Sequence, residues 1–339
     1  MVPSATIIGG RGQSGQAIAA QLVADGWRVT ATTHAEPSDD LAGSDVRWVH
    51  GDAEDGDLTA IDGTDVIVHT TAYDVKDARQ LIELGDRVGS VIVLSSVSVY
   101  SDDQGRSLDE AVGEATFPAW PVPIPETWVT LAPGAANYST RKVALEESLR
   151  EGATCPVTII RPGAIYGPHS RHLREWYFIK RVLDHRERVV LPYGGASIFQ
   201  PIASVNLAAL VSLAAARPGN RTLNCGDLDP PSVTRISEVI DDLMGWSTQR
   251  VLVDGPEPGP NVGNNPWAVP RPVVVDMSSA LAELGYVQRA SYDGALSDTL
   301  RWALDACRER DWREVFPQLA KYYHDLFDYE AEDAYLDHG

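Results

Sequence analysis

The sequence predicts an α/β protein with a doubly wound parallel sheet and a second, smaller C-terminal domain. Short β-rich apolar runs alternate with helical stretches through the first half of the chain, and the first of these runs leads into a glycine-rich turn. Strands that alternate with helices form βαβ units, in which the strands lie parallel. The length of 339 residues exceeds one ordinary core of ~100–200 residues and fits one large or two interlocked domains.

Six strands and two helices are expected in the first half. In residues 15–25 the apolar side chains of Ile18, Leu22 and Val23 share one face, as in an amphipathic helix, and Gly26 ends it. A second helix is expected at 139–150. The expected strands are 6–8, 27–33, 46–49, 66–69, 91–94 and 157–161.

The second half, after Tyr166, predicts mainly helices. Residues 254–272 are rich in Pro, Gly and Asn and predict a loop or lid. We therefore place the first domain at 1–168, with 190–216 returning to it, and the second domain with the C-terminal helices at 169–339. The expected helices are 173–188, 203–216, 233–244, 278–284, 298–307 and 315–327.

Charge and cysteine usage narrow the classes of partner and compartment. Lys and Arg number 28 against 48 Asp and Glu, and the net charge of −20 repels nucleic-acid phosphate and anionic lipid. The longest nearly apolar run, 202–216, is shorter than the ~20 residues that span a bilayer. The N-terminus lacks signal-peptide features, and the three cysteines are scattered. We expect a cytoplasmic protein with no membrane, nucleic-acid or metal partner; His169 and His172 lack a third ligand.

The turn after the first strand has the composition of a dinucleotide-binding loop. Its glycines follow the spacing GxxGxxG at a strand-to-helix junction. A pyrophosphate needs backbone N–H groups close to it and the positive end of a helix dipole, and side chains would block that approach. The alternative is a tight turn without a ligand. The candidate cofactor-binding residues of this turn are Gly9, Arg11, Gly12, Gln13, Ser14 and Gly15.

The end of the second strand bears on the choice between NAD and NADP. Thr33 and His34 stand where an Asp or Glu would accept hydrogen bonds from the ribose of NAD. Arg11 could lie over a 2′-phosphate, so we predict a preference for NADP, although the acidic residues at 36, 39 and 40 count against it. Asp52, after the third strand, is placed to meet the adenine amino group or to form a turn beside Gly51.

A tyrosine and a lysine share one helix face further along the chain. Tyr138 and Lys142 are four residues apart, which brings their Cβ atoms to ~6 Å in a helix. A lysine ammonium there can stabilise a phenolate, whose ordinary pKa of ~10 must fall by ~3 units for acid–base work near pH 7. A surface pair is the alternative. Upstream, Ser95, Ser96 and Ser98 follow the strand at 91–94, and ligands bind at the carboxyl ends of such strands.

Taken in chain order, these motifs resemble the extended short-chain dehydrogenase/reductase family, in its epimerase/dehydratase-like branch. The resemblance also includes Arg-Pro-Gly-Ala-Ile-Tyr-Gly-Pro at 161–168 and weaker patterns at 224–240 and 276–285, so it covers nearly the whole chain. It implies a Rossmann domain that holds NAD(P) and a smaller C-terminal substrate domain.

The resemblance also implies roles for individual residues. Tyr138 would be the general acid/base, and Lys142 would bind the nicotinamide ribose and tune Tyr138. Ser96 would hydrogen-bond the reacting oxygen, with Ser95 and Ser98 as the alternatives. The residues expected to line the cofactor trough are Thr70, Thr71 and Ala72 after the fourth strand, and Pro162 and Gly163 beside the nicotinamide.

The chain departs from the family pattern at three places. Val97-Ser98 replaces the Asp-Glu pair of sugar 4,6-dehydratases. Ala164 and Phe199 stand where nucleotide-sugar enzymes carry an Asn and an Arg that hold a diphosphate. The reading as a dehydratase therefore lacks its acid and base, and the reading as a nucleotide-sugar enzyme lacks two diphosphate contacts.

Two further segments bear on the substrate. The 42-residue connection from Ser96 to Tyr138 is rich in aromatic residues and proline, which predicts either a lid with an apolar substrate face or a self-packed loop. Residues 169–188 carry six Lys and Arg, which could bind a carboxylate or phosphate or could pair with acidic neighbours. The candidate substrate-binding residues are Ser98, Trp120, Trp128, Ala164, Arg171 and Gln200.

These observations predict an NAD(P)-dependent oxidoreductase that transfers a hydride at a carbonyl or hydroxyl carbon of a small, apolar substrate. An epimerase with tightly held NAD is the first alternative, and a non-catalytic cofactor-sensing or RNA-binding member is the second. A homodimer is expected, because Val143, Leu145 and Leu149 give the helix of Tyr138 more apolar surface than one sheet contact needs. Alternatively, residues 315–327 fold over this surface.

Overall fold

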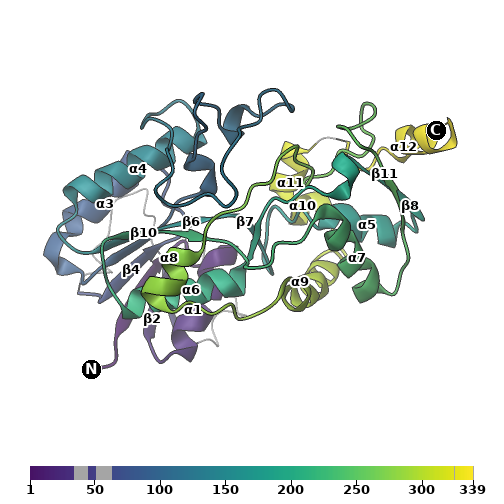
Figure 1. Ribbon diagram of the computed structural model, residues 1–339. Helices are drawn as coiled ribbons and strands as arrows, with labels where there is room; N and C mark the ends of the chain where they lie inside the picture. Colours follow the sequence, from purple (N-terminus) through teal and green to yellow (C-terminus); the bar gives the residue numbers. More distant parts are fainter. Residues whose placement is uncertain (34–44, 51–62, 324, 339) are drawn as a thin grey trace.

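The computed structural model describes residues 1–33, 45–50, 63–323 and 325–338. His34 and Asp52, both predicted to contact the cofactor, lie outside the described residues. The described chain has a seven-stranded central sheet with helices on both faces and a second group of helices beyond its end (Figure 1). The predicted fold class, a doubly wound α/β domain followed by a smaller C-terminal domain, is confirmed.

Every neighbouring pair of strands in the central sheet is parallel. The chain leaves β1 in one direction to build β2 and β3, and returns to the other side of β1 to build β4, β5 and β6. The strand order reverses between β1 and β4, and sheets of this kind bind ligands at the carboxyl ends of the strands at such a reversal. The order is β3 (Val46–His50), β2 (Arg28–Thr33), β1 (Ser4–Ile8), β4 (Val66–His69), β5 (Val91–Leu94), β6 (Val157–Pro162) and β10 (Arg221–Cys225).

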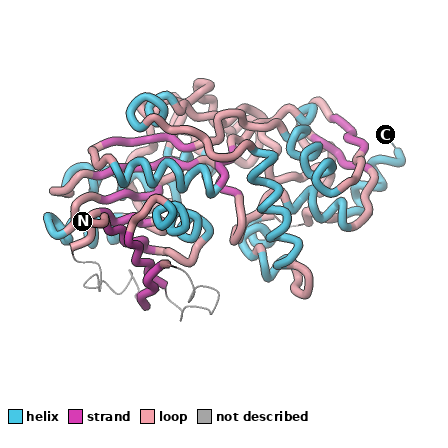
Figure 2. The backbone as a smooth tube through the Cα atoms, turned by 90° about the horizontal axis from the view of Figure 1, so that it is seen from below, coloured by secondary structure: helices cyan, strands magenta, loops and turns pink. Residues whose placement is uncertain are grey.

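Helices cover both faces of this sheet (Figures 1 and 2). One face packs against α3 (Val75–Leu84) and α4 (Tyr138–Gly152), and the other against α1 (Gln13–Ala24), α6 (Ser204–Ala216) and α8 (Ser278–Leu284). Because side chains alternate along a strand, neighbouring residues serve different cores. In β4, Val66 and Val68 belong to the core under α1 and α6, whereas Ile67 belongs to the core under α3 and α4.

The C-terminal domain is built mainly from helices around a core of large aromatic side chains such as Trp176, Tyr177 and Phe316. A small parallel sheet of β8 (Arg188–Leu191) and β11 (Gln249–Leu252) lies within it. Another, of β7 (Ala164–Tyr166) and β9 (Pro201–Ala203), lies where the domains meet. The helices are α5 (Trp176–Leu183), α7 (Val233–Met244), α9 (Tyr292–Ala306), α10 (Trp312–Val315), α11 (Pro317–Tyr322) and α12 (Tyr329–His338). Short 3₁₀ helices are η3 (Gly85–Arg87), η4 (Val97–Val99), η5 (Leu108–Glu110) and η6 (Tyr193–Gly195).

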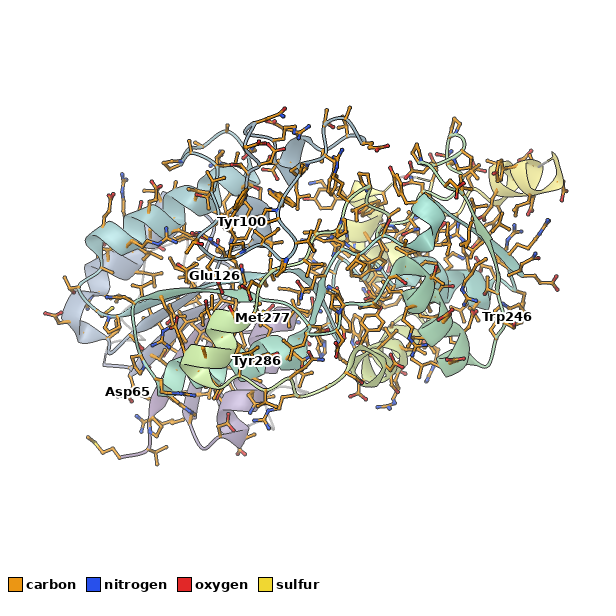
Figure 3. The ribbon with its side chains drawn as sticks, viewed as in Figure 1. Asp65, Tyr100, Glu126, Trp246, Met277 and Tyr286 are labelled. Atoms are coloured by element: carbon orange, nitrogen blue, oxygen red, sulfur yellow. The ribbon has the colours of Figure 1, made fainter. Side chains whose placement is uncertain are left out.

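The division into domains differs in detail from the expected one. Within 190–216, α6 lies on the central sheet, but the end of β8 pairs with β11 in the C-terminal domain. β10 and α8, which come later in the chain, also belong to the first domain. Asn224 fastens β10 to the long connection between β5 and α4. Its side-chain carbonyl accepts from the Tyr100 hydroxyl (2.6 Å), and its backbone N–H donates to the Glu126 carboxylate (3.0 Å) (Figure 3).

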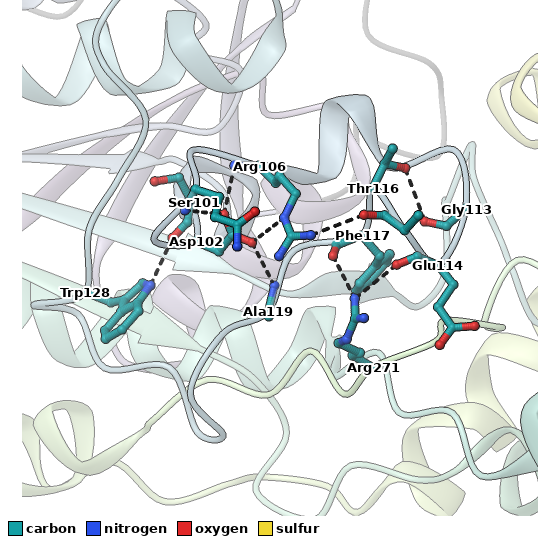
Figure 4. Close-up of polar contacts among 12 residues, drawn as sticks. Ser101, Asp102, Arg106, Gly113, Glu114, Thr116, Phe117, Ala119, Trp128 and Arg271 are labelled. Atoms are coloured by element: carbon teal, nitrogen blue, oxygen red, sulfur yellow. Dashed lines mark hydrogen bonds and ion pairs between the residues drawn. The ribbon is translucent and has the colours of Figure 1, made fainter.

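The long connection between β5 and α4 packs on itself (Figure 4). Of the two expectations for this connection, a lid or a self-packed loop, the structure favours the self-packed loop. Asp102 accepts from the Arg106 side chain (2.6 Å) and from the Ala119 N–H (3.1 Å). Arg271, near the end of the loop at 254–272, donates to the backbone carbonyls of Glu114 (3.1 Å) and Phe117 (2.8 Å). The connection is thereby fastened to the C-terminal half of the chain.

The apolar residues of α4 that suggested a homodimer are buried within the chain itself. Val143, Leu145 and Leu149 are each at most 1% exposed, and Leu145 and Leu149 pack in the core shared with α3. That argument for a homodimer is therefore removed, and the homodimer remains a prediction. In the described part of the chain, no helix combines the length and apolarity needed to cross a bilayer.

Candidate active site

The glycine-rich turn is shaped by two of its three spaced glycines. Gly9 has a φ of +79°, and a Cβ there would lie 2.6 Å from the Thr70 hydroxyl. That hydroxyl donates to the carbonyls of Ile8 (3.0 Å) and Gly9 (3.2 Å) and so braces the turn from β4. A Cβ on Gly15 would lie 2.3 Å from the Gly9 carbonyl oxygen, so Gly15 lets α1 pack against the turn.

Gly12 is different, because nothing in the described chain requires a glycine there. Its φ of −70° is open to every residue, and the nearest atom to an added Cβ is the Gly9 oxygen at 3.5 Å. Gly12 is the N-cap of α1 and supplies no side-chain cap, so the first turn of this helix presents free N–H groups. A bare backbone at a helix N-terminus fits a pyrophosphate, which must approach closely and carries negative charge.

The remaining predicted cofactor residues come from the turn itself and from the ends of β2, β4 and β6. Thr33 is buried at the end of β2, Thr71 is exposed after β4, and Arg11 is exposed beside Gly12. The Gln13 side chain donates to the Gly167 carbonyl (3.3 Å). Ser14, Ala72, Pro162 and Gly163 complete the predicted set; a Cβ on Gly163 would lie 2.4 Å from the Gln200 carbonyl oxygen.

Tyr138 is the first residue of α4 and is held there by a capping box. The Asn137 side chain accepts from the Thr140 N–H (2.9 Å), and the Thr140 hydroxyl accepts from the Asn137 N–H (3.1 Å). From the long connection, the Asp109 carboxylate accepts from the Ser139 N–H (2.9 Å). These bonds fix the start of the helix and therefore the direction in which the Tyr138 ring leaves it.

The Tyr138 hydroxyl is a neutral proton donor in the protein alone. Burial raises its pKa to about 12, against a smaller lowering by the Ser96 hydroxyl, and Asp109 raises it further. The ring lies 5.9 Å from that of Tyr73, centroid to centroid. The charge of Tyr322, at the end of α11, also raises the pKa of Tyr138.

Lys142 lies beneath the Tyr138 ring, with its Nζ 5.6 Å from the ring centroid. The side chain is buried, and Nζ donates to the carbonyls of Leu94 (2.8 Å) and Ala72. Burial lowers the pKa of Lys142 to about 8, while Asp77 and Glu146 raise it in part. The ammonium is thus fixed between the ends of β4 and β5, where its charge favours a Tyr138 phenolate.

Among the three serines after β5, Ser96 is the one beside Tyr138. It is the N-cap of η4, and its hydroxyl accepts from the Ser98 N–H (3.1 Å). Ser95 donates instead to the buried Glu146 carboxylate (2.5 Å). Ser98 is buried, and its hydroxyl has no partner among the described residues.

The six predicted substrate residues differ in burial and in their partners, and two of them are in contact: the Ala164 N–H donates to the Gln200 carbonyl (3.1 Å). Gln200 uses both ends of its amide within the protein, donating to the Asp227 carbonyl (2.7 Å) and accepting from the Val275 N–H (2.7 Å). Trp128 donates its indole N–H to the Ser101 carbonyl (2.9 Å). Arg171 is exposed. Ser98, Trp120 and Ala164 are buried or half-buried.

The basic segment at 169–188 is paired largely with the acidic C-terminus. Arg181 meets Glu332 (3.4 Å), Arg186 meets Asp333, and Arg188 meets Asp337 (3.1 Å). Lys180 meets Asp184 (2.7 Å) on its own helix. Four of the six cations therefore hold α12 or α5 in place, and the structure favours the alternative of acidic neighbours for them.

A sequence profile decides the family. The profile of the NAD dependent epimerase/dehydratase family matches residues 5–226, which is well over half of the chain. The chain belongs to this family. The predicted resemblance is confirmed, and the chain is an NAD-dependent enzyme of the short-chain dehydrogenase/reductase type.

Solved structures with the same fold include several family enzymes. A UDP-N-acetylglucosamine 4-epimerase from Methanobrevibacter ruminantium M1 has a TM-score of 0.68 at 17% identity, covering 90% of this chain and 100% of its own. A UDP-glucose 4-epimerase from Thermotoga maritima, in complex with UDP-glucose, has 0.66 at 17%, covering 89% and 99%. MoeE5, in complex with UDP-glucuronic acid and NAD, has 0.64 at 18%, covering 89% and 99%. No curated protein sequence matches the chain significantly.

Proposed function

We propose that the protein transfers a hydride between a nicotinamide cofactor and a carbonyl or hydroxyl carbon of a small substrate. The observation that carries this proposal is the convergence of Ser96, Tyr138 and Lys142 at the carboxyl ends of β4 and β5, next to a turn whose Gly12 leaves room for a pyrophosphate.

The side chains divide the chemistry between them. When bound, the cofactor supplies the donor or acceptor of the hydride. Tyr138 gives a proton to the substrate oxygen in reduction and takes it back in oxidation. Ser96 hydrogen-bonds the same oxygen and orients it, and the Lys142 charge lowers the energy of the Tyr138 phenolate.

An epimerase that oxidises and re-reduces one carbon is the second candidate, because the similar structures are those of sugar-nucleotide 4-epimerases. Ala164 and Phe199, which replace two diphosphate contacts, count against a nucleotide-sugar substrate. A purely cofactor-sensing or RNA-binding role is disfavoured by the complete Ser96, Tyr138 and Lys142 set and by the net charge of −20.

Measuring whether the nicotinamide cofactor is consumed separates the oxidoreductase from the epimerase. The protein is incubated with NADH or NADPH and a panel of carbonyl compounds, and with NAD and nucleotide sugars. An oxidoreductase changes the absorbance of the nicotinamide in proportion to product. An epimerase carries cofactor through purification and interconverts sugars with no net change in absorbance. Absence of both results across the panel would contradict the proposal.

The glycine turn gives a test of cofactor binding that is independent of the substrate. Gly12→Ala should fold as the wild type does, because the added Cβ has no neighbour closer than 3.5 Å. It should weaken NAD(H) binding by ~10-fold or more, since the methyl group displaces the pyrophosphate from the N–H groups. Cofactor fluorescence titration measures this, with Gly113→Ala, in open space in the long connection, as the control. Unchanged affinity in Gly12→Ala would remove the turn from cofactor binding.

The preference for NADP remains a prediction, and several similar structures are complexes with NAD. If the exposed Arg11 contacts a 2′-phosphate, Arg11→Ala should weaken NADPH binding by ~1–3 kcal/mol and leave NADH binding nearly unchanged. Equal losses for both cofactors would mean that Arg11 only supports the turn. A wild type that binds NADH more tightly would overturn the preference itself.

A further inference from the structure

Three polar side chains lie on one face of α4. Tyr138, Lys142 and Glu146 are four residues apart along this helix, a spacing that brings side chains to the same face. The first two belong to the candidate active site. Glu146 is 0% exposed, and a glutamate is almost never buried to that degree unless it is paired. Its carboxylate lies one helical turn from the Lys142 ammonium.

The end of β5 contacts these three side chains through three consecutive residues. Each residue contacts one side chain, so the strand end is held against one face of α4. The contacts join the Leu94 carbonyl with the Lys142 ammonium (2.8 Å), the Ser95 hydroxyl with the Glu146 carboxylate (2.5 Å), and the Ser96 hydroxyl with that of Tyr138. Glu146 is therefore held by the same strand end as the two residues of the proposed proton transfer.

The groups around Lys142 differ in charge. Burial lowers the pKa of Lys142 to about 8, while Asp77, from α3, and Glu146 raise it in part. Asp77 is half-buried, so solvent screens part of its charge, whereas the charge of Glu146 is fully buried. His69, from β4, is buried as well, and burial lowers its pKa to about 4, so it is neutral near pH 7. The Tyr138 hydroxyl is also neutral.

Glu146 keeps its negative charge because Arg161, in β6, is bound to it. The Arg161 side chain donates to both oxygens of the Glu146 carboxylate (3.0 and 2.6 Å). Burial raises the pKa of Glu146, but the hydrogen bonds and the charge of Arg161 outweigh it. The carboxylate is thus ionised and fixed in position at neutral pH, on the helix face that it shares with Lys142.

We propose that Glu146 is a positioning residue for the proton transfer, whose buried charge keeps Lys142 an ammonium beneath the Tyr138 ring. The inference deepens the proposed function and rests on it, because the ammonium is what favours the Tyr138 phenolate. A buried lysine without an anion nearby loses its proton more readily. Glu146 therefore acts through Lys142 rather than on the reacting atoms.

The charge of Lys142 can be followed by NMR, because the sequence has few lysines. Protein labelled with ¹³C at the lysine Cε is titrated with alkali, and Lys142→Met identifies the signal of Lys142. In the wild type this signal should titrate at lower pH than the others. In Glu146→Gln, which keeps the shape of the side chain but removes its charge, the midpoint should fall by ~1 pH unit further. The lysines of the chain are Lys76, Lys142, Lys180 and Lys321.

Glu147→Gln is the matched control, because it removes the same charge from the next residue of α4, which is half-buried and on another face of the helix than Lys142. Its Lys142 midpoint should match that of the wild type. A merely structural role of Glu146 predicts the opposite direction, because loosened packing admits water to Lys142 and raises its pKa toward the ordinary lysine value. An unchanged or raised midpoint in Glu146→Gln, or an equal fall in Glu147→Gln, overturns the proposal.

A second variant carries the test if Glu146→Gln does not fold by circular dichroism. Glu146→Leu combined with Arg161→Met replaces the whole buried pair by apolar side chains, a change that is often neutral for stability. The fall in the Lys142 midpoint should persist in this double variant, and a midpoint equal to that of the wild type would again overturn the proposal.

Turnover gives a second readout once a substrate is identified. Because Lys142 loses its proton at lower pH in Glu146→Gln, the alkaline limit of the oxidation reaction should move to lower pH by the same amount, and it should not move in Glu147→Gln. An unmoved limit in Glu146→Gln would contradict the proposal. The NMR titration needs no substrate, so a protein that turns over no compound of the panel would contradict the proposed function and leave the titration result unaffected.

Discussion

Tyr138→Phe is expected to lower turnover by ~10²–10⁴-fold, the usual contribution of a general acid/base. The substitution removes one hydroxyl and keeps the ring that packs 5.9 Å from Tyr73 and 5.6 Å from the Lys142 ammonium. The capping box at Asn137 and Thr140 does not involve the lost atom, so the helix should form as before. NAD(H) binding should therefore survive while proton transfer is lost.

Tyr73→Phe is the matched control, because it removes the same atom from the neighbouring ring. Tyr73 is 41% exposed and Tyr138 42% exposed, so the two changes perturb packing to a similar degree. Steady-state turnover and cofactor fluorescence are measured for both variants. Turnover of Tyr138→Phe within a few-fold of the wild type, or an equal loss in Tyr73→Phe, would remove Tyr138 from the proton transfer.

The first six strands of the central sheet were predictable because each carries its own local signal. β1, β4 and β5 are short apolar runs that are buried on both sides, as expected for parallel strands covered by helices. α1 and α4 have apolar residues at helical spacing and end within two residues of their expected bounds.

The later strands could not be read from local pattern. β10 joins the sheet through pairs such as Leu223 with Ile160, and β11 pairs with β8 across about sixty residues. Only tertiary context selects these partners. The helix expected at 173–188 is shorter because the chain turns at His185, whose φ is +57°, and β8 follows at once; the sequence around it has neither glycine nor proline to mark the turn.

Local sequence pattern also predicts only part of the candidate site. Ser96, Tyr138 and Lys142 follow from motifs within short stretches, and the structure places them together. Tyr322, 184 positions further along the chain, acts electrostatically on Tyr138, and no sequence spacing predicts that influence. The pairing of Arg181 and Arg186 with carboxylates of α12, about 150 positions further along the chain, could not be predicted from the sequence either.

The second large expected effect is on stability, and it comes from a buried ion pair beneath the candidate site. Arg161, in β6, donates to both oxygens of the Glu146 carboxylate from α4 (3.0 and 2.6 Å), and the two side chains are 3% and 0% exposed. Burial alone would raise the pKa of Glu146, but the Arg161 hydrogen bonds and charge, helped by Ser95, outweigh it and hold the pKa below the ordinary 4.5. The pair ties the helix of Tyr138 and Lys142 to the sheet.

Arg161→Met should lower the free energy of unfolding by ~3–5 kcal/mol, because it leaves a carboxylate buried without its main partner. Arg150→Met is the matched control: Arg150 contacts the same carboxylate (2.8 Å) but is 43% exposed, so its loss should cost ~0–1 kcal/mol. Because the folded-state pKa of Glu146 is depressed, the stability from this pair is present above the unfolded pKa and is lost as the pH falls through the folded one. Urea unfolding at neutral and acidic pH measures both effects, and similar losses in the two variants at neutral pH would show that the buried pair does not hold α4 on the sheet.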